Sequence, residues 1–358
     1  MFTFTDKQWD TIRQNTRKWW KNELHRPLLP MIFYGKDPGM AEPKAPMPSF
    51  ANAGDFSIPP EAVIDRWDYY FSCCEFLGDS FPIMQMTHFG PGVVAAFLGC
   101  DAHCTPETVW FSPENPVSAA DLHLTYDPDN VWLRRVKDIY RAGRKRWGGN
   151  VCLGMIDLGG IMDILASFLT TENLLYDLYD EPEEISRLVG EAAALWRRFY
   201  DEINEEIGEQ QGYSDWCGIF SEKPSYMMQS DFCFMISPEH FDEFVFGELR
   251  DTSSRLYRPF YHLDGVGELR HLDKILSIDT IAGIQWIPGD GEPSARDWSE
   301  LFKRISDAGK KIQPPYGLDR YLDEVVTAVN RPDDIVKVAA GLPYEQKEYW
   351  IKKLSKYF

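Results

Sequence analysis

Cysteine is scarce in this 358-residue sequence, and long apolar runs are missing. The seven cysteines are odd in number and form no pair of CxxC motifs, which argues against a disulfide framework and a zinc finger. They are Cys73, Cys74, Cys100, Cys104, Cys152, Cys217 and Cys233. The apolar stretch Ile281–Ile287 is far shorter than the roughly 20 residues that span a bilayer. No signal peptide is visible either, so we expect a cytoplasmic protein with no membrane segment.

Basic residues are outnumbered, with 37 Lys and Arg against 56 Asp and Glu and a net charge of -19. A chain this acidic repels phosphate backbones and anionic lipid surfaces, so nucleic-acid and membrane partners are not expected. Aromatic residues, by contrast, make up 14% of the chain and apolar residues 44%. That content is enough to bury a core that offsets the entropy lost on folding, which excludes a disordered chain.

Several common catalytic motifs are also absent. The sequence has no GxSxG, no HExxH and no GxGxxG turn after a predicted strand. The glycine loop around Gly289 carries Asp290 and Glu292, which would repel a phosphate group. The Cys100, His103, Cys104 cluster lacks a second half with usable spacing for zinc. These absences exclude the best-known hydrolase, metalloprotease and nucleotide-binding classes.

Predicted strands and helices alternate along most of the chain. The periodicity predicts helices over 60–77, 131–147, 160–179 and from 182, and strands over 28–34, 81–86, 151–156, 213–220, 259–263, 280–286 and 335–340. Such alternation is typical of a parallel sheet. We predict an α/β fold, a (β/α)8 TIM barrel forming a single domain over 1–358, with a helical N-terminal extension over 1–27. An open doubly wound sheet is the alternative.

The segment Tyr261-His262-Leu263-Asp264 ends a predicted strand, where barrel enzymes carry their functional groups. His262 and Asp264 are two residues apart and therefore face the same side of the strand. They could bind one metal ion together, or Asp264 could orient His262 as an acid or base. A structural role, with His262 satisfied by its neighbours and Asp264 capping the next helix, stays open.

Further candidates follow from position alone. Glu222 and Asp231 lie after the predicted 213–220 strand and are available as acids, bases or ligands, so they join His262 and Asp264 as catalytic candidates. Residues expected to line a substrate pocket are Tyr34, His88, Asp157, Tyr226, Gln285 and Trp286. Asp79, beside the second strand, is a candidate of the same positional kind. For Trp286, simple packing in the core is the competing interpretation.

Three segments of the second half carry a resemblance: QSDFCFMISPEHFDEFVFGELR, YHLDGVGELRHLDKILSIDTIAGIQWIPGDGEP and WSELFKRISDAGKKI. They resemble the uroporphyrinogen decarboxylase superfamily, which includes the decarboxylase of tetrapyrrole synthesis and cobalamin-dependent methyltransferases that act on thiols. The resemblance implies a (β/α)8 barrel with its active site at the carboxyl ends of the strands.

The two branches of this superfamily differ at testable positions. In the decarboxylases an arginine-rich segment after the first strand binds the carboxylates of the substrate, whereas residues 33–39 here contain Lys36, Asp37 and no Arg. In the thiol methyltransferases an H-x-C pair and a C-terminal Cys bind zinc. His262-Leu263-Asp264 stands in the position of that pair, and no Cys lies in the C-terminal stretch. The resemblance therefore implies zinc only in an altered ligand set, with His262, Asp264 and an acid such as Glu222.

Three functions follow as hypotheses. The favoured one is an enzyme that moves a methyl group between a corrinoid, supplied by a partner protein, and a small nucleophile activated at His262 and Asp264, with or without zinc. The second is a lyase that decarboxylates a carboxylated substrate, with Asp79 or the His–Asp pair as the acidic group. The third is a non-catalytic binding barrel. A small-molecule substrate is expected for the first two, and a homodimer is the assembly we keep open.

Overall fold

The computed structural model describes residues 2–115, 117–289, 291–292, 297–315 and 322–358. Its helices are α1 (Asp6–Trp20), α2 (Pro60–Ser72), α3 (Val94–Phe97), α4 (Val131–Trp147), α5 (Ile161–Leu169), α6 (Thr171–Asp180), α7 (Pro182–Ile207), α8 (Pro238–Phe244), α9 (Phe246–Ser253), α10 (Leu272–Leu276), α11 (Ser299–Asp307), α12 (Leu322–Val329) and α13 (Lys347–Leu354). Its strands are β1 (Pro30–Tyr34), β2 (Cys74–Gly78), β3 (Ile83–Met84), β4 (Asp101–Cys104), β5 (Val109–Ser112), β6 (Cys152–Leu153), β7 (Met227–Met228), β8 (Phe260–Asp264), β9 (Gly283–Ile287), β10 (Lys311–Gln313) and β11 (Ala339–Pro343). Short 3-10 turns include η2 (Thr87–Phe89), η3 (Asp231–Met235) and η4 (Val266–His271).

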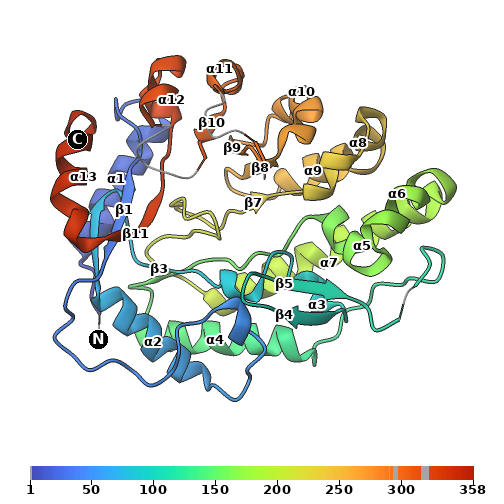
Figure 1. The fold of residues 1–358 in the computed structure, drawn as a ribbon, viewed down its shortest axis with the longest axis horizontal. Helices are drawn as coiled ribbons and strands as arrows, with labels where there is room; N and C mark the ends of the chain where they lie inside the picture. The colour runs from blue at the N-terminus through green and yellow to red at the C-terminus, as the bar shows by residue number, and fades with distance from the viewer. Residues whose placement is uncertain (1, 116, 290, 293–296, 316–321) are drawn as a thin grey trace.

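Parallel pairing dominates the sheets, as the alternation of strands and helices predicts. Strands β10, β9, β8 and β7 form one parallel sheet in that order, and β3 pairs with β6 in parallel. Strand β1 lies between β11, which is parallel to it, and β2, which is antiparallel. Parallel bridges from Ile312 to Ile335 and from Leu28 to Val336 continue the order from β10 to β1. The fold is therefore α/β (Figure 1). The pairings among the described residues do not by themselves close a ring, so the TIM barrel stays a prediction.

The N-terminal helix is shorter and more tightly packed than expected. It ends at Trp20 rather than near Pro27. Trp9 and Trp19 are fully buried, and the indole N–H of Trp19 donates to the carbonyl of Ile335 at 3.0 Å. Full burial of a large apolar side chain stabilises a fold by about 1.5–3 kcal/mol. The helix is therefore part of the core, next to the elements from the other end of the chain (Figure 1).

Two predicted elements are wrong. The segment 213–220 is not a strand: one antiparallel bridge joins Tyr213 to Ser221, because Asp215 accepts the N–H groups of Cys217 (2.9 Å) and Met227 (2.6 Å) and turns the chain. The predicted helix over 60–77 ends at Ser72, and Cys74–Gly78 forms β2. Pairing with β1 decides this short apolar run, whose own sequence favours neither state.

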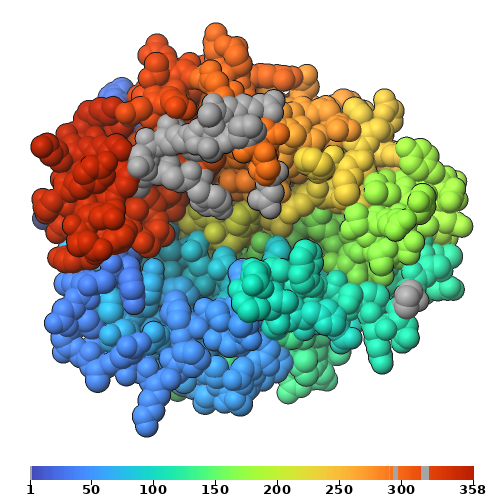
Figure 2. All heavy atoms as spheres, in the orientation of Figure 1, coloured from blue at the N-terminus to red at the C-terminus, as the bar shows by residue number. Residues whose placement is uncertain are grey.

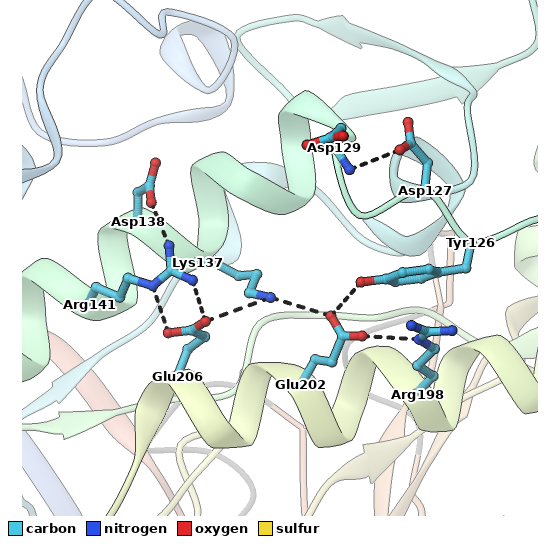
Figure 3. Close-up of polar contacts among 9 residues, drawn as sticks. All are labelled: Tyr126, Asp127, Asp129, Lys137, Asp138, Arg141, Arg198, Glu202 and Glu206. Carbon is cyan, nitrogen blue, oxygen red and sulfur yellow. Dashed lines mark hydrogen bonds and ion pairs between the residues drawn. The ribbon is translucent and has the colours of Figure 1, made fainter.

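Helices α4 and α7 pack together through apolar faces and a polar rim. The predicted stripe of α7 is buried, including Leu188, Trp196 and Phe199. Along the outer edge, Arg141 pairs with Glu206, and Glu202 accepts from Arg198 at 3.0 Å (Figure 3). No helix among the described residues combines the length and apolar content needed to cross a membrane.

Candidate functional site

Three ionisable side chains meet at the carboxyl end of β8. His262 and Asp264 lie on one face of this strand, and Asp231 opens η3 after β7. One donor atom from each lies within 4.8 Å of the other two, and His262 Nε2 is 4.0 Å from Asp231 Oδ1. The predicted pair thus acquires a third member at the end of a neighbouring strand. Asp231 is one of the catalytic candidates predicted from its position after the 213–220 segment.

A chain of side-chain amides fixes the orientation of His262. Gln313 on β10 donates its Nε2 to the carbonyl of Cys217 at 3.2 Å, so its Oε1 is free to accept from Gln285 Nε2 at 2.8 Å. Gln285 on β9 then presents Oε1 to Nδ1 of His262. Because a carbonyl oxygen can only accept, the proton of His262 is assigned to Nδ1. The lone pair of Nε2 therefore points toward Asp231.

Burial sets the charge of the imidazole. The pKa of His262 is lowered by burial, and the Asp264 carboxylate opposes this effect together with Gln285. A His with a pKa below its usual 6.5 is neutral at pH 7. A neutral imidazole whose Nε2 carries no proton can bind a metal ion or accept a proton.

Asp163 is a functional candidate that the sequence interpretation missed. It lies on α5, and its carboxylate accepts the N–H of Phe232 at 2.8 Å and the N–H of Asp231 at 3.1 Å. Burial, followed by the charge of Asp231, raises the pKa of Asp163 to about 7. Burial, followed by the charge of Asp264, raises the pKa of Asp231 to about 7. About half of the Asp231 side chain is nevertheless accessible to solvent, because it faces a recess described below. Asp163 therefore positions the loop that carries Asp231.

Asp157 and Tyr226 lie together beneath this cluster. The Tyr226 hydroxyl donates to Asp157 at 3.3 Å and accepts the N–H of Leu158 at 2.7 Å. Burial raises the pKa of Asp157 to about 6, against the N–H groups that stabilise its charge. The charge of Asp157 also acts on His262. Both predicted pocket residues are thus buried supports of the site.

Glu222 and Trp286 do not join the cluster. Glu222 forms an ion pair with Arg17 of α1, with Arg17 Nε 2.7 Å from Glu222 Oε1. Trp286 follows Gln285 on β9 and therefore faces the opposite side, where its ring is fully buried 4.9 Å from that of Trp298. Packing, the competing interpretation for Trp286, matches this placement.

Tyr34, His88 and Asp79 are also engaged elsewhere. Tyr34 stacks on Tyr70, with ring centroids 5.1 Å apart. His88 in η2 is buried, and burial lowers its pKa to about 3. Asp79 accepts from Asn15 at 2.9 Å, from Arg26 at 2.6 Å and from the N–H of Leu29 at 2.8 Å. These contacts tie α1 to β1.

A recess of about 340 Å³ opens beside Asp231, the member of the three-residue cluster that lines it. Asp163 and Asp231 are the ionisable residues of its described lining, and Ser167, Thr171 and Gln229 are polar neighbours in it. Its apolar lining includes Trp110 and Phe111 from β5 and Met235 from η3. In Figure 2 the face of the molecule is hollowed between the teal atoms of the first half and the yellow and orange atoms of the second half. The volume is in the range of small-molecule sites, about 300–1,000 Å³.

Comparison with known proteins identifies a structural likeness. No family model and no curated protein sequence matches the chain. Among solved structures, the chain is similar to a methyltransferase from Methanosarcina mazei, with a TM-score of 0.54 and 12% identity over 87% of this chain and 94% of the other. At this identity the likeness is one of fold.

Proposed function

We propose that this chain is a (β/α)8 barrel enzyme of the uroporphyrinogen decarboxylase superfamily that transfers a methyl group between a corrinoid, carried by a partner protein, and a small nucleophile. The convergence of Asp231, His262 and Asp264 at the ends of parallel strands carries the proposal. The likeness to the Methanosarcina mazei methyltransferase, over 87% of this chain, supports the fold on which it rests. The parallel order from β7 to β1 supports the barrel.

The three donors fit a divalent metal ion. Two ligands that each lie about 2.1 Å from a tetrahedral zinc ion are about 3.4 Å apart, and the atoms here lie within 4.8 Å of one another. Small side-chain rotations would close the difference. One imidazole and two carboxylates suit zinc, and the amide chain through Gln285 resembles the outer hydrogen bonds that orient metal-binding histidines. Zinc bound there would lower the pKa of a thiol or a water molecule and so supply a nucleophile.

The residues of the chain can also act without a metal. His262 is neutral and offers Nε2 as a proton acceptor, while Gln285 holds the Nδ1 proton in place. A nucleophile with an acidic S–H or O–H group could pass its proton to Nε2. The Asp264 carboxylate would stabilise the imidazolium that forms, since its charge already favours the protonated ring.

The other two hypotheses gain less from the structure. For decarboxylation, Asp79 is held by Asn15, Arg26 and Leu29 away from the cluster, which leaves the His262–Asp264 pair as its acidic group. The solved structure that the chain resembles is a methyltransferase, which favours methyl transfer over this reaction. A non-catalytic barrel would leave the candidate residues apart. His262, Asp264 and Asp231 instead lie within 4.8 Å of one another, while Glu222 is engaged by Arg17.

The proposal is tested with the purified protein, methylcobalamin and a small thiol. We expect His262→Ala to lower methyl transfer by at least about 100-fold, since it removes the only imidazole of the cluster. We also expect wild type to hold about one zinc ion, and His262→Ala to bind zinc at least about 10-fold more weakly. His25→Ala is the matched control, because this side chain is 82% exposed. Methyl transfer by His262→Ala at the wild-type rate would refute the proposal. Wild type that depends on His262 but holds no metal would support the acid–base version.

A further inference from the structure

The recess beside the catalytic candidates has an apolar wall that solvent reaches. Trp110 on β5 lines the recess, and 66% of its surface is accessible. Met235 from η3 also lines the recess and is 44% accessible. Large apolar side chains that gather at the edge of a cavity mark a place where a ligand or partner is covered. The hairpin of β4 and β5 holds Trp110 there, in register opposite His103.

The charge of the recess has one sign. Asp163 and Asp231 line it, and no Lys, Arg or His appears among the lining residues that the structure describes. A divalent ion on Asp231, His262 and Asp264 would balance the two carboxylates among its ligands, and Asp163 would line the recess outside that set. Asp157 and Asp163 add two more carboxylates that act on the same histidine. At pH 8 the ionisable groups that line the described part of the recess are therefore all acidic, with or without a metal.

We propose that the recess binds a small organic cation whose charge is spread over methyl groups, of the quaternary ammonium class. An anion would be repelled by the carboxylates, and a neutral apolar molecule would remove water from them without supplying a compensating charge. A methylated cation satisfies both walls, because it is attracted to the face of an aromatic ring and to a carboxylate. This inference rests on the proposed function and names the methylated partner of the transfer. A quaternary ammonium ion has no lone pair, so its methyl group would pass to the reduced corrinoid while the C–N bond breaks, and the electron pair would stay on nitrogen as the lone pair of a tertiary amine, the small nucleophile of the reverse reaction.

The test compares two molecules of nearly the same shape. Choline carries a trimethylammonium group, and 3,3-dimethylbutanol replaces it with an uncharged tert-butyl group. Binding is measured by isothermal titration calorimetry at pH 8 and low salt, with no metal or methyl donor present, so that failure of methyl transfer leaves this result unaffected. We expect choline to bind about 3- to 30-fold more tightly than 3,3-dimethylbutanol, in line with the strength of cation–aromatic contacts.

Variants locate the site. Trp110→Ala should lower choline affinity about 3- to 30-fold, and Asp163→Asn should lower it several-fold and reduce its salt dependence. Tyr349→Ala on α13 is the matched control, since it removes an aromatic ring that is 56% accessible outside the recess, and circular dichroism confirms that each variant is folded. Equal affinity for the two molecules, no binding of choline, or binding that neither recess variant weakens would overturn the proposal. Loss of choline binding in both recess variants, with the control unchanged, would support it.

Discussion

The carboxylate of Asp163 should make the stability of the protein depend on pH. Its pKa is raised from 3.8 to about 7, chiefly by burial and then by the charge of Asp231. An acid whose pKa is higher in the folded state binds its proton more tightly there, so its contribution to stability is present at low pH and lost as pH rises. The loss should begin near pH 4 and be complete somewhat above pH 7.

The expected magnitude follows from the two pKa values. For a pKa of 3.8 in the unfolded chain and about 7 in the folded one, raising the pH from 5 to 8 lowers the unfolding free energy by about 2.6 kcal/mol. Solvent in the recess weakens the electrostatic effect, so we expect about 2 kcal/mol. Asparagine has the same shape and no titration. The unfolding free energy of Asp163→Asn, minus that of wild type, should therefore be about 2 kcal/mol more positive at pH 8 than at pH 5.

Urea unfolding at a series of pH values measures this difference directly. Asp129→Asn, which removes one carboxylate from the exposed surface, is the matched control for the loss of a negative charge. Asp163→Ala should destabilise the protein at every pH by about 2–4 kcal/mol, because the N–H groups of Asp231 and Phe232 lose their acceptor. Parallel stability curves for wild type and Asp163→Asn from pH 5 to pH 8 would refute the reasoning.

Two further predictions concern backbone contact and surface charge. Gly159→Ala should lower the unfolding free energy by about 2 kcal/mol or more, because Gly159 has a φ of +80° and a Cβ there would lie 2.5 Å from the Cα of Gly92. Gly190 lies in an open position on α7, so Gly190→Ala should raise the unfolding free energy by about 0.5–1 kcal/mol. Thermal unfolding measures both variants, and the same change in stability for Gly159→Ala and Gly190→Ala would contradict this account. Arg141→Ala removes the pairs with Glu206 and Asp138 shown in Figure 3 and should cost less than about 1 kcal/mol. The cost should vanish in 1 M salt, and a larger, salt-independent loss would contradict a surface role.

Local signals predicted the helices better than the short strands. Helix α4 has the predicted bounds, because Asn130 caps its first turn and Gly148 in a left-handed conformation ends it. Strand β10 and the hairpin of β4 and β5 escaped prediction. Pairing with partners far along the chain decides such segments, and a window of a few residues does not contain that information. Homodimer formation stays a prediction.

The candidate site was predictable in its centre and less so around it. The spacing of His262 and Asp264 indicated a shared face, and the position of Asp231 after the preceding predicted strand made it a candidate. Asp163 has one signal, an acidic residue inside the apolar run 158–169, but an acid is also ordinary in the helix that the periodicity predicts over 160–179. Gln313 has no such signal in the sequence. Its role, orienting Gln285, depends on the register of β9 and β10, which places the two glutamines side by side.

The position of β1 has a consequence for biosynthesis. Met31 pairs with Ala339, and Leu28 forms its bridge with Val336, so one edge of this early strand is completed by residues near the other end of the chain. During translation β1 can pair with β2 at once, but its second edge must wait until residues 335–343 leave the ribosome. Contacts this distant in sequence slow folding and leave an unpaired edge open to aggregation. A nascent chain that stalls before residue 335 should therefore be a stronger client for chaperones than one in which residues 335–343 have left the ribosome.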